Sequence, residues 1–177
     1  LSHSSAASDV YKRQGPWDQL IKLQNITLEK IQNELTIKLN SRISITPILV
    51  PHRDEYSETV CYLVSTMKKK LLYIPDIDKW HLWDKDIKEM IKIVDYALLD
   101  GTFYQDGELS RDMSKIPHPF VKESMMLFKD LSKQNKQKVF FTHLNHTNPL
   151  IIKESKEQFE VKKLGFNFAM DNLVLEL

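Results

Sequence analysis

Histidine and aspartate side chains follow three apolar runs of this 177-residue sequence. His52 follows residues 42–50 (RISITPILV), Asp76 follows residues 70–74 (KLLYI), and His143 follows residues 138–142 (KVFFT) directly. Neutral imidazole and carboxylate together suit Zn, Mn or Fe in a hydrolytic site. Loops at strand ends are common places for such sites. The pattern therefore predicts a metal site at one edge of a sheet.

Each of these residues also has a purely structural interpretation. A histidine after a strand is more often a solvated loop residue than a ligand, and Asp76 or Asp78 could cap a turn. His143 and His146 stand three residues apart in a loop rich in Asn and Thr, which is also typical of a hydrogen-bonded turn. The shared position after strands favours the metal site, but the spacing alone does not name a fold.

The elements that must position these side chains are mostly short strands. Alternation and β-branched residues predict strands at 26–31, 34–39, 42–50, 59–65, 70–74, 96–99, 138–142, 159–164, 166–170 and 173–177. Pro47 inside residues 42–50 favours an edge or a bulge. Apolar spacing predicts a helix from an N-cap at Asp84 to about Asp95, and a second over 120–133. This order of elements predicts an α/β or α+β fold with helices on a sheet face.

The bulk composition is that of an ordinary globular domain. The sequence is 42% hydrophobic and has 25 basic against 24 acidic residues, a net charge of +1. This balance argues against nucleic acid and anionic membranes as partners, and no apolar run approaches the roughly 20 residues of a membrane span. Cys61 is the single cysteine and excludes an intrachain disulfide. We therefore expect a cytoplasmic protein with a small-molecule substrate, and the oligomeric state stays open.

The first residues have a different character. Residues 1–14 are small and polar, and residues 4–14 (SSAASDVYKRQ) resemble the translation of a transposase adapter used in sequencing libraries. We therefore expect a non-native tail over residues 1–14 and native sequence from about Gly15.

Five longer stretches carry a resemblance to a known family. The runs PHRDEYSETVCYLV and KKLLYIPDID, followed by FFTHLNH, resemble the second half of metallo-β-lactamase-superfamily proteins. The runs ALLDGTFY, RDMSKIPHPF and FFTHLNHTNPL are similar to the branch that includes pyrroloquinoline-quinone (PQQ) biosynthesis protein B. The resemblance covers essentially residues 15–177 and implies the C-terminal half of an αββα sandwich.

The resemblance also implies roles for single residues. His52 would bind a first metal, Asp76 would bridge two metals and His143 would bind the second, with Zn the expected ion and Mn or Fe as alternatives. His146 and Asp100 would line the site and serve as catalytic proton donors, and Asp54 would orient a ligand histidine. The superfamily's other ligands come from a His-x-His-x-Asp-His motif that this sequence lacks. We expect that motif to precede Gly15.

The function that follows is two-metal hydrolysis of an ester or phosphodiester. The PHRDE run departs from the pattern of the biosynthesis branch and favours a hydrolase. Two alternatives stay open: an iron-dependent oxygenase step in PQQ biosynthesis, and a non-catalytic binding module. Because half a sandwich leaves a sheet face uncovered, we expect this chain alone to bind metal weakly and to be inactive.

Overall fold

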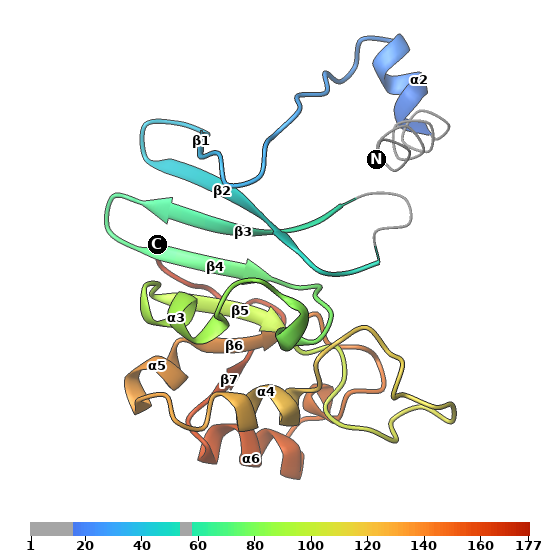
Figure 1. The fold of residues 1–177 in the computed structure, drawn as a ribbon, viewed down its shortest axis with the longest axis vertical. Helices are drawn as coiled ribbons and strands as arrows, with labels where there is room; N and C mark the ends of the chain where they lie inside the picture. The colour runs from blue at the N-terminus through green and yellow to red at the C-terminus, as the bar shows by residue number, and fades with distance from the viewer. Residues whose placement is uncertain (1–15, 54–57) are drawn as a thin grey trace.

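The computed structural model describes residues 16–53 and 58–177 (Figure 1). Their strands form one seven-stranded sheet in which spatial order follows chain order. The strands are β1 (Ile37–Lys38), β2 (Ile43–Val50), β3 (Thr59–Thr66), β4 (Lys70–Ile74), β5 (Tyr96–Asp100), β6 (Val139–Thr142) and β7 (Asn167–Phe168). Strands β1 to β4 pair antiparallel, and β4 to β7 pair parallel.

Helices connect the parallel strands and lie over one face of the sheet (Figure 1). They are the 3-10 turn η1 (Trp80–Leu82), α3 (Ile87–Lys92), α4 (Val121–Leu127), α5 (Lys133–Gln137), η2 (Pro149–Ile151) and α6 (Lys156–Lys163). The strands are added in one direction, so right-handed crossovers place every connecting helix on the same side. A further helix, α2 (Pro16–Lys22), precedes the sheet. Among the described residues, no helix has the length and apolar character that a membrane span requires.

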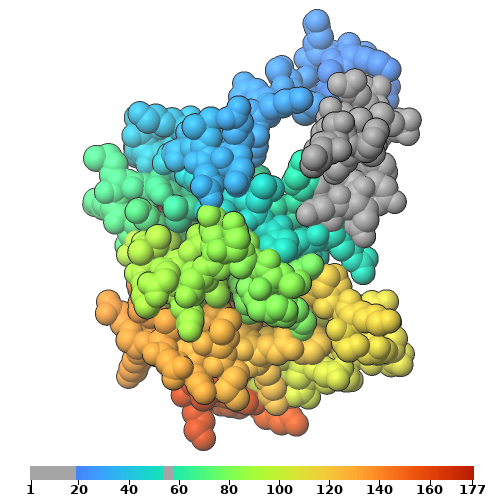
Figure 2. Space-filling model, in the orientation of Figure 1, coloured from blue at the N-terminus to red at the C-terminus, as the bar shows by residue number. Residues whose placement is uncertain are grey.

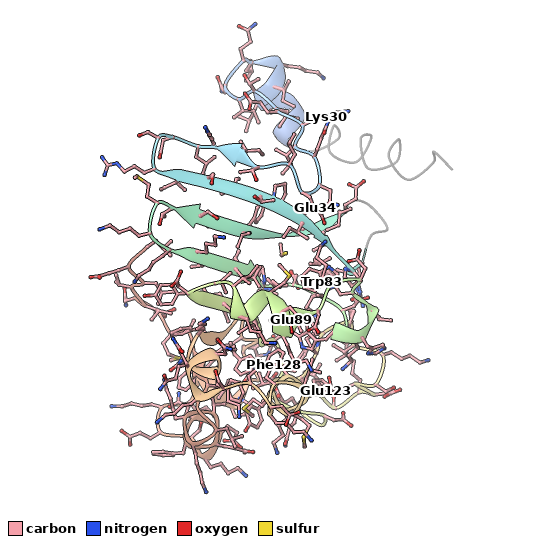
Figure 3. The ribbon with its side chains drawn as sticks, turned by 60° about the vertical axis from the view of Figure 1, so that its left-hand side comes forward. Lys30, Glu34, Trp83, Glu89, Glu123 and Phe128 are labelled. Atoms are coloured by element: carbon pink, nitrogen blue, oxygen red, sulfur yellow. The ribbon has the colours of Figure 1, made fainter. Side chains whose placement is uncertain are left out.

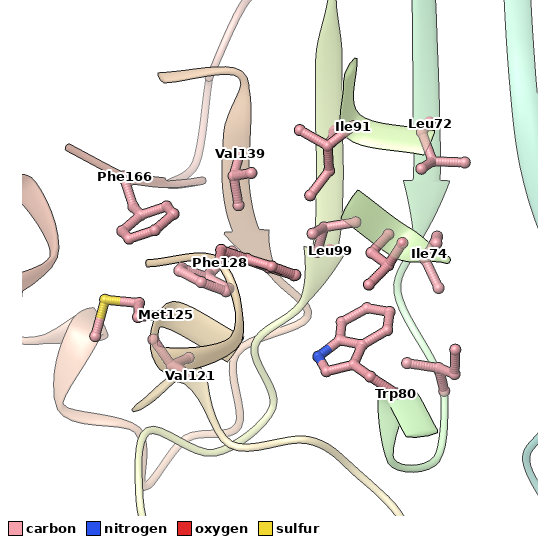
Figure 4. Packing of buried hydrophobic residues seen from close by; sticks show 14 of the residues in the cluster. Leu72, Ile74, Trp80, Ile91, Leu99, Val121, Met125, Phe128, Val139 and Phe166 are labelled. Atoms are coloured by element: carbon pink, nitrogen blue, oxygen red, sulfur yellow. The ribbon is translucent and has the colours of Figure 1, made fainter. Parts of the chain in front are cut away.

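The core fills the space between this face and the helices. Leu72, Leu99 and Phe141 point to the helices and are fully buried. Their neighbours along each strand point to the other face and are half-buried or exposed, as Tyr73 and Phe140 are. Aromatic rings fill the helix side: the Phe128 ring centroid lies 6.0 Å from Trp80 and 6.4 Å from Phe166 (Figure 4). The period-two burial explains why the β-branched runs predicted this part of the sheet well.

The N-terminal strand predictions were largely wrong. Residues 26–31 form no strand, and of residues 34–39 only Ile37–Lys38 pair with β2. The apolar side chains there, such as Leu28 and Leu35, are exposed, because nothing in residues 16–53 and 58–177 covers them. The edge prediction for Pro47 is consistent with the structure. Its carbonyl oxygen accepts a hydrogen bond from Glu34 N at 2.7 Å. The nitrogen of Pro47, which has no hydrogen to donate, points to the same side of β2, where β1 pairs over only two residues.

The two predicted helices have different bounds. Asp84 is not the N-cap of α3; Asp86 is, and its side chain accepts a hydrogen bond from Lys88 N. The helix predicted over 120–133 ends at Leu127, and a separate helix, α5, begins at Lys133, where Ser132 caps it by accepting from Asn135 N. A serine cap competes with a continuing helix for the same backbone donors.

The terminal strands were also mostly wrong. Residues 159–163 lie in α6 and Leu164 is its C-cap; the N-cap Ser155 accepts from Gln158 N, and the last turn carries Lys162 and Lys163. These are ordinary helix start and stop signals that the apolar alternation concealed. Of residues 166–170 only Asn167–Phe168 form a strand, and residues 173–177 form none.

Candidate metal centre

The ends of β2, β4, β5 and β6 meet on one edge of the sheet. Pro51 follows β2, and its carbonyl oxygen accepts from Asp78 N at 2.7 Å, so the loops after β2 and β4 are tied together. Gly101 follows β5 and donates from N to Thr142 O at 2.9 Å. A Cβ at Gly101 would lie 2.9 Å from the Cβ of Phe141, so glycine permits this close approach.

Three side chains converge at this edge. His52, Asp76 and His118 each offer one ligand atom, and these atoms lie within 4.8 Å of one another. The Nε2 of His52 lies 3.5 Å from Asp76 Oδ1, and Nδ1 of His118 lies 3.7 Å from the same oxygen. Two imidazoles and a carboxylate at this separation form a donor set that fits a transition-metal ion.

A fourth side chain approaches the same carboxylate. Nδ1 of His143 lies 3.7 Å from Asp76 Oδ1. His143 has a positive φ of 58°, an uncommon left-handed conformation for a residue other than glycine. The structure thus brings together the three residues expected as ligands, His52, Asp76 and His143, around the oxygen of Asp76.

Two carboxylates, the half-buried Asp78 and the fully buried Asp100, hold two of the histidine rings. Nδ1 of His52 lies 3.1 Å from Asp78 Oδ1, and Nδ1 of His118 lies 2.7 Å from Asp100 Oδ2. Because an ionised carboxylate only accepts, each Nδ1 donates, and in the neutral ring Nε2 keeps a free lone pair. Carboxylate–histidine pairs of this kind commonly orient histidines that bind metals.

Asp100 is fully buried, and both of its oxygens are engaged. Oδ1 accepts from Thr102 N and Oγ1 at 2.9 and 2.8 Å, and Oδ2 accepts from Ile77 N at 3.2 Å as well as from His118. Thr102 Oγ1 also lies 3.1 Å from Nδ1 of His143. Asp100 therefore links the loops after β4 and β5 and positions His118. This geometry favours a positioning role over the proton-donor role that we expected from the sequence.

The other two expected site residues are His146 and Asp54. His146 is exposed, and none of the contacts resolved for the described residues joins it to the three converging side chains. Its loop is fixed instead by Asn148, which is fully buried and donates from Nδ2 to Gly101 O at 2.7 Å. Asp54 lies outside the described residues.

The sequence reasoning missed His118. This residue stands 18 positions after Asp100, between Pro117 and Pro119 in a polar loop, and no strand precedes it. Nothing in the local pattern marked it except the two prolines and its place in the RDMSKIPHPF run.

A pocket opens beside the cluster. It has a volume of about 410 Å³ and is lined by His52, Arg53, Thr102, Phe103, Arg111, Asp112, Lys115, Ile116, Pro117 and His118. The loop that supplies most of this lining is the yellow segment on the right flank of the molecule, beside the turquoise end of β2 (Figure 2). Two of the converging histidines thus face a space of the size that a small molecule needs.

The chain is similar in sequence to one protein family and to several known proteins. The family described as "Beta-lactamase superfamily domain" matches residues 4–144. "Coenzyme PQQ synthesis protein B" of Acinetobacter baumannii (strain SDF) is 25% identical over 144 residues, which cover 76% of this chain and 46% of that protein. The protein of the same name from Methylorubrum extorquens (strain ATCC 14718 / DSM 1338 / JCM 2805 / NCIMB 9133 / AM1) is 29% identical, covering 97% and 58%. The chain spans about half the length of these relatives.

Solved structures show the same fold. Zn(2+)-bound PqqB from Methylobacterium extorquens superposes with a TM-score of 0.68 at 24% identity, covering 84% of this chain and 55% of that one. The metallo-beta-lactamase fold protein YhfI from Bacillus subtilis gives a TM-score of 0.53 at 14% identity, covering 84% and 56%.

Proposed function

The chain belongs to the β-lactamase superfamily and resembles PQQ synthesis protein B, and from this premise we propose that it forms part of a metal-dependent hydrolase. The observation that carries the proposal is the convergence of His52, Asp76 and His118 beside a pocket. The substrate bond would be an ester or a phosphodiester. The proposal extends to two divalent ions, with Zn first and Mn or Fe as alternatives.

The side chains have distinct parts in this proposal. His52, Asp76 and His118 would hold metal, and His143, whose Nδ1 also lies 3.7 Å from Asp76 Oδ1, would hold a second ion. Bound divalent ions lower the pKa of a water molecule to near neutrality and offset negative charge that develops on the substrate. The chain's own contribution is to fix its histidines: Asp78 orients His52, and Asp100 orients His118.

Asp76 is the residue to test, because all three histidines lie within 3.7 Å of its Oδ1. Asp76→Asn in the longest form of the protein that contains this chain should remove most bound metal and reduce ester or phosphodiester turnover to background. Asp130→Asn is the matched control, because this carboxylate is exposed between α4 and α5 and belongs to neither the cluster nor the pocket lining. Normal metal content and turnover in Asp76→Asn would contradict the proposal.

A second candidate function has its own supporting observation. Two histidines and one carboxylate are also the donor set of non-haem iron oxygenases. The relatives named "Coenzyme PQQ synthesis protein B" point to a biosynthetic step rather than to hydrolysis. Oxygen consumption that depends on added Fe(II), without hydrolysis of any ester or phosphodiester in the panel, would favour this candidate. Protein that binds no metal would favour a binding module.

A further inference from the structure

The pocket beside the candidate metal centre has an unusual charge. Three of its lining residues are basic, Arg53, Arg111 and Lys115, and one is acidic, Asp112, so these four carry a formal charge of +2. The whole sequence carries only +1 from 49 charged residues, 25 basic and 24 acidic. These four lining residues therefore carry a local excess of positive charge, beside the carboxylates that contact the two lining histidines.

The loop that carries two of these cations is fixed by its own small core. Phe103, Met113, Ile116 and Phe120 form a cluster of buried residues, with Leu109 packed against it. Backbone hydrogen bonds from Ile116 N to Met113 O and from His118 N to Ile116 O close the turn that leads to His118. One loop thus supplies both a candidate ligand and the basic lining.

Burial of Met113 and Ile116 leaves their polar neighbours outside. Arg111 and Lys115 are exposed, and none of the ion pairs resolved over residues 16–53 and 58–177 engages either of them. The nearby carboxylate of Asp112 is engaged within the loop, because its Oδ1 accepts from Ser114 N at 2.9 Å. The two cations are therefore available to a ligand in the pocket.

We infer that the pocket takes small anionic substrates, bearing a carboxylate or phosphate group that Arg111 and Lys115 bind while the reacting bond lies over His52 and His118. Only the position of the reacting bond over His52 and His118 rests on the proposed function; anion binding by Arg111 and Lys115 does not. Arginine suits this task because its planar guanidinium donates two parallel hydrogen bonds to either oxyanion. Lysine adds a compact charge on a flexible stem.

The test measures anion binding separately from metal binding. The metal-free chain is titrated with inorganic phosphate and, in a second arm, with glutarate, and NMR shifts or heat report the affinity. We expect at least one of the two anions to bind and its affinity to weaken with added NaCl. R111Q/K115Q should weaken that binding at least tenfold, and the preferred probe identifies which oxyanion the substrate carries.

K129Q/K153Q is the matched control, since it removes the same charge from exposed positions outside the pocket. It should change the affinity less than twofold. Failure of both anions to bind, or equal weakening in the two double variants, would overturn the inference. Zinc content is measured in parallel. Normal zinc content and weakened anion binding in R111Q/K115Q would support both proposals. Anion binding by a wild-type protein that binds no zinc would contradict the proposed hydrolase and support the anion pocket.

Discussion

The sheet has two parts that differ in how they are covered. The antiparallel part, β1 to β3, contributes only Ile48, Val50 and Cys61 to the main buried cluster. The parallel part, β4 to β7, carries the helices and contributes most of that cluster (Figure 4). Figure 3 shows the same contrast, with Glu34 beside the sparsely covered strands, Phe128 within the helical layer, and Trp83 between them.

The candidate metal centre spans both parts. His52 follows the antiparallel strand β2, whereas Asp76, His118 and His143 come from the parallel part. Three of the four side chains therefore follow well-packed strands or helices, whereas the position of His52 depends on the contacts that join β2 to the helical layer. We therefore expect stability to reside in the parallel part and metal affinity to depend on both.

The largest expected effect is on the helical layer. Phe128 is fully buried between Trp80 and Phe166, so Phe128→Ala should lower the free energy of unfolding by about 3–5 kcal/mol. Ile45→Ala in β2, where the side chain is half-buried, should cost about 1 kcal/mol. Denaturant unfolding of the two variants measures both. Equal losses would show that the two parts are packed alike.

A smaller effect is expected where the two parts join. Trp83 is buried, and its Nε1 donates to Leu49 O at 2.8 Å. Trp83→Phe should cost about 2 kcal/mol, because it leaves the Leu49 carbonyl without this partner. Amides of β2 should then exchange with solvent faster while those of β5 do not. Trp80→Phe, which loses a bond to Ser124 inside the helical layer, is the comparison variant and should spare β2.

Cys61 gives a pH test of burial in the antiparallel part. Burial raises the pKa of its thiol from 9.0 to about 12. The unfolded chain therefore loses this proton first, so stability is intact below pH 9 and falls as the pH rises towards 12. At pH 10 the loss is on the order of 1 kcal/mol. The stability difference between wild type and Cys61→Ala should shift by this amount between pH 8 and pH 10, and a difference that stays constant would mean that the thiol is exposed.

The smallest effect is expected at the surface. Lys85 pairs with Glu34, and the two side chains are 30% and 54% exposed. Glu34→Gln should change the free energy of unfolding by only about 0.5 kcal/mol, since solvent screens such pairs. Thermal melts at low and high salt provide the measurement. A loss above 2 kcal/mol would mean that this ion pair, rather than Trp83, ties the N-terminal segment to the helical layer.

The sequence predicted the central strands because each has one buried face and a clear turn. The strands predicted at 59–65 and 70–74 pair as a hairpin, in which Thr66 N donates to Lys69 O across the turn. The prediction failed over residues 26–31 and 159–164, where apolar residues were read as strands. In the first stretch nothing in the described chain covers them, and in the second the capping by Ser155 prevails.

The site was predictable only where a strand leads to it. His52, Asp76 and His143 each follow an apolar run, and the sheet register brings their strands to one edge. His118 reaches the same edge through an irregular loop, which no period in the sequence reveals. His146 is close to His143 in sequence but not in contact with the cluster, because the turn fixed by Asn148 leaves it exposed.

We propose that His118, and not His146, joins His52 and Asp76 in the candidate metal centre. Calorimetric titration of the chain with Zn²⁺ tests it most directly, in wild type, His118→Ala and His146→Ala. We expect His118→Ala to weaken zinc affinity by more than about tenfold, since even partners of ligands contribute that much, and His146→Ala to stay within twofold of wild type. Unchanged affinity in His118→Ala, or an equal loss in His146→Ala, would show that His118 is not a ligand of this centre.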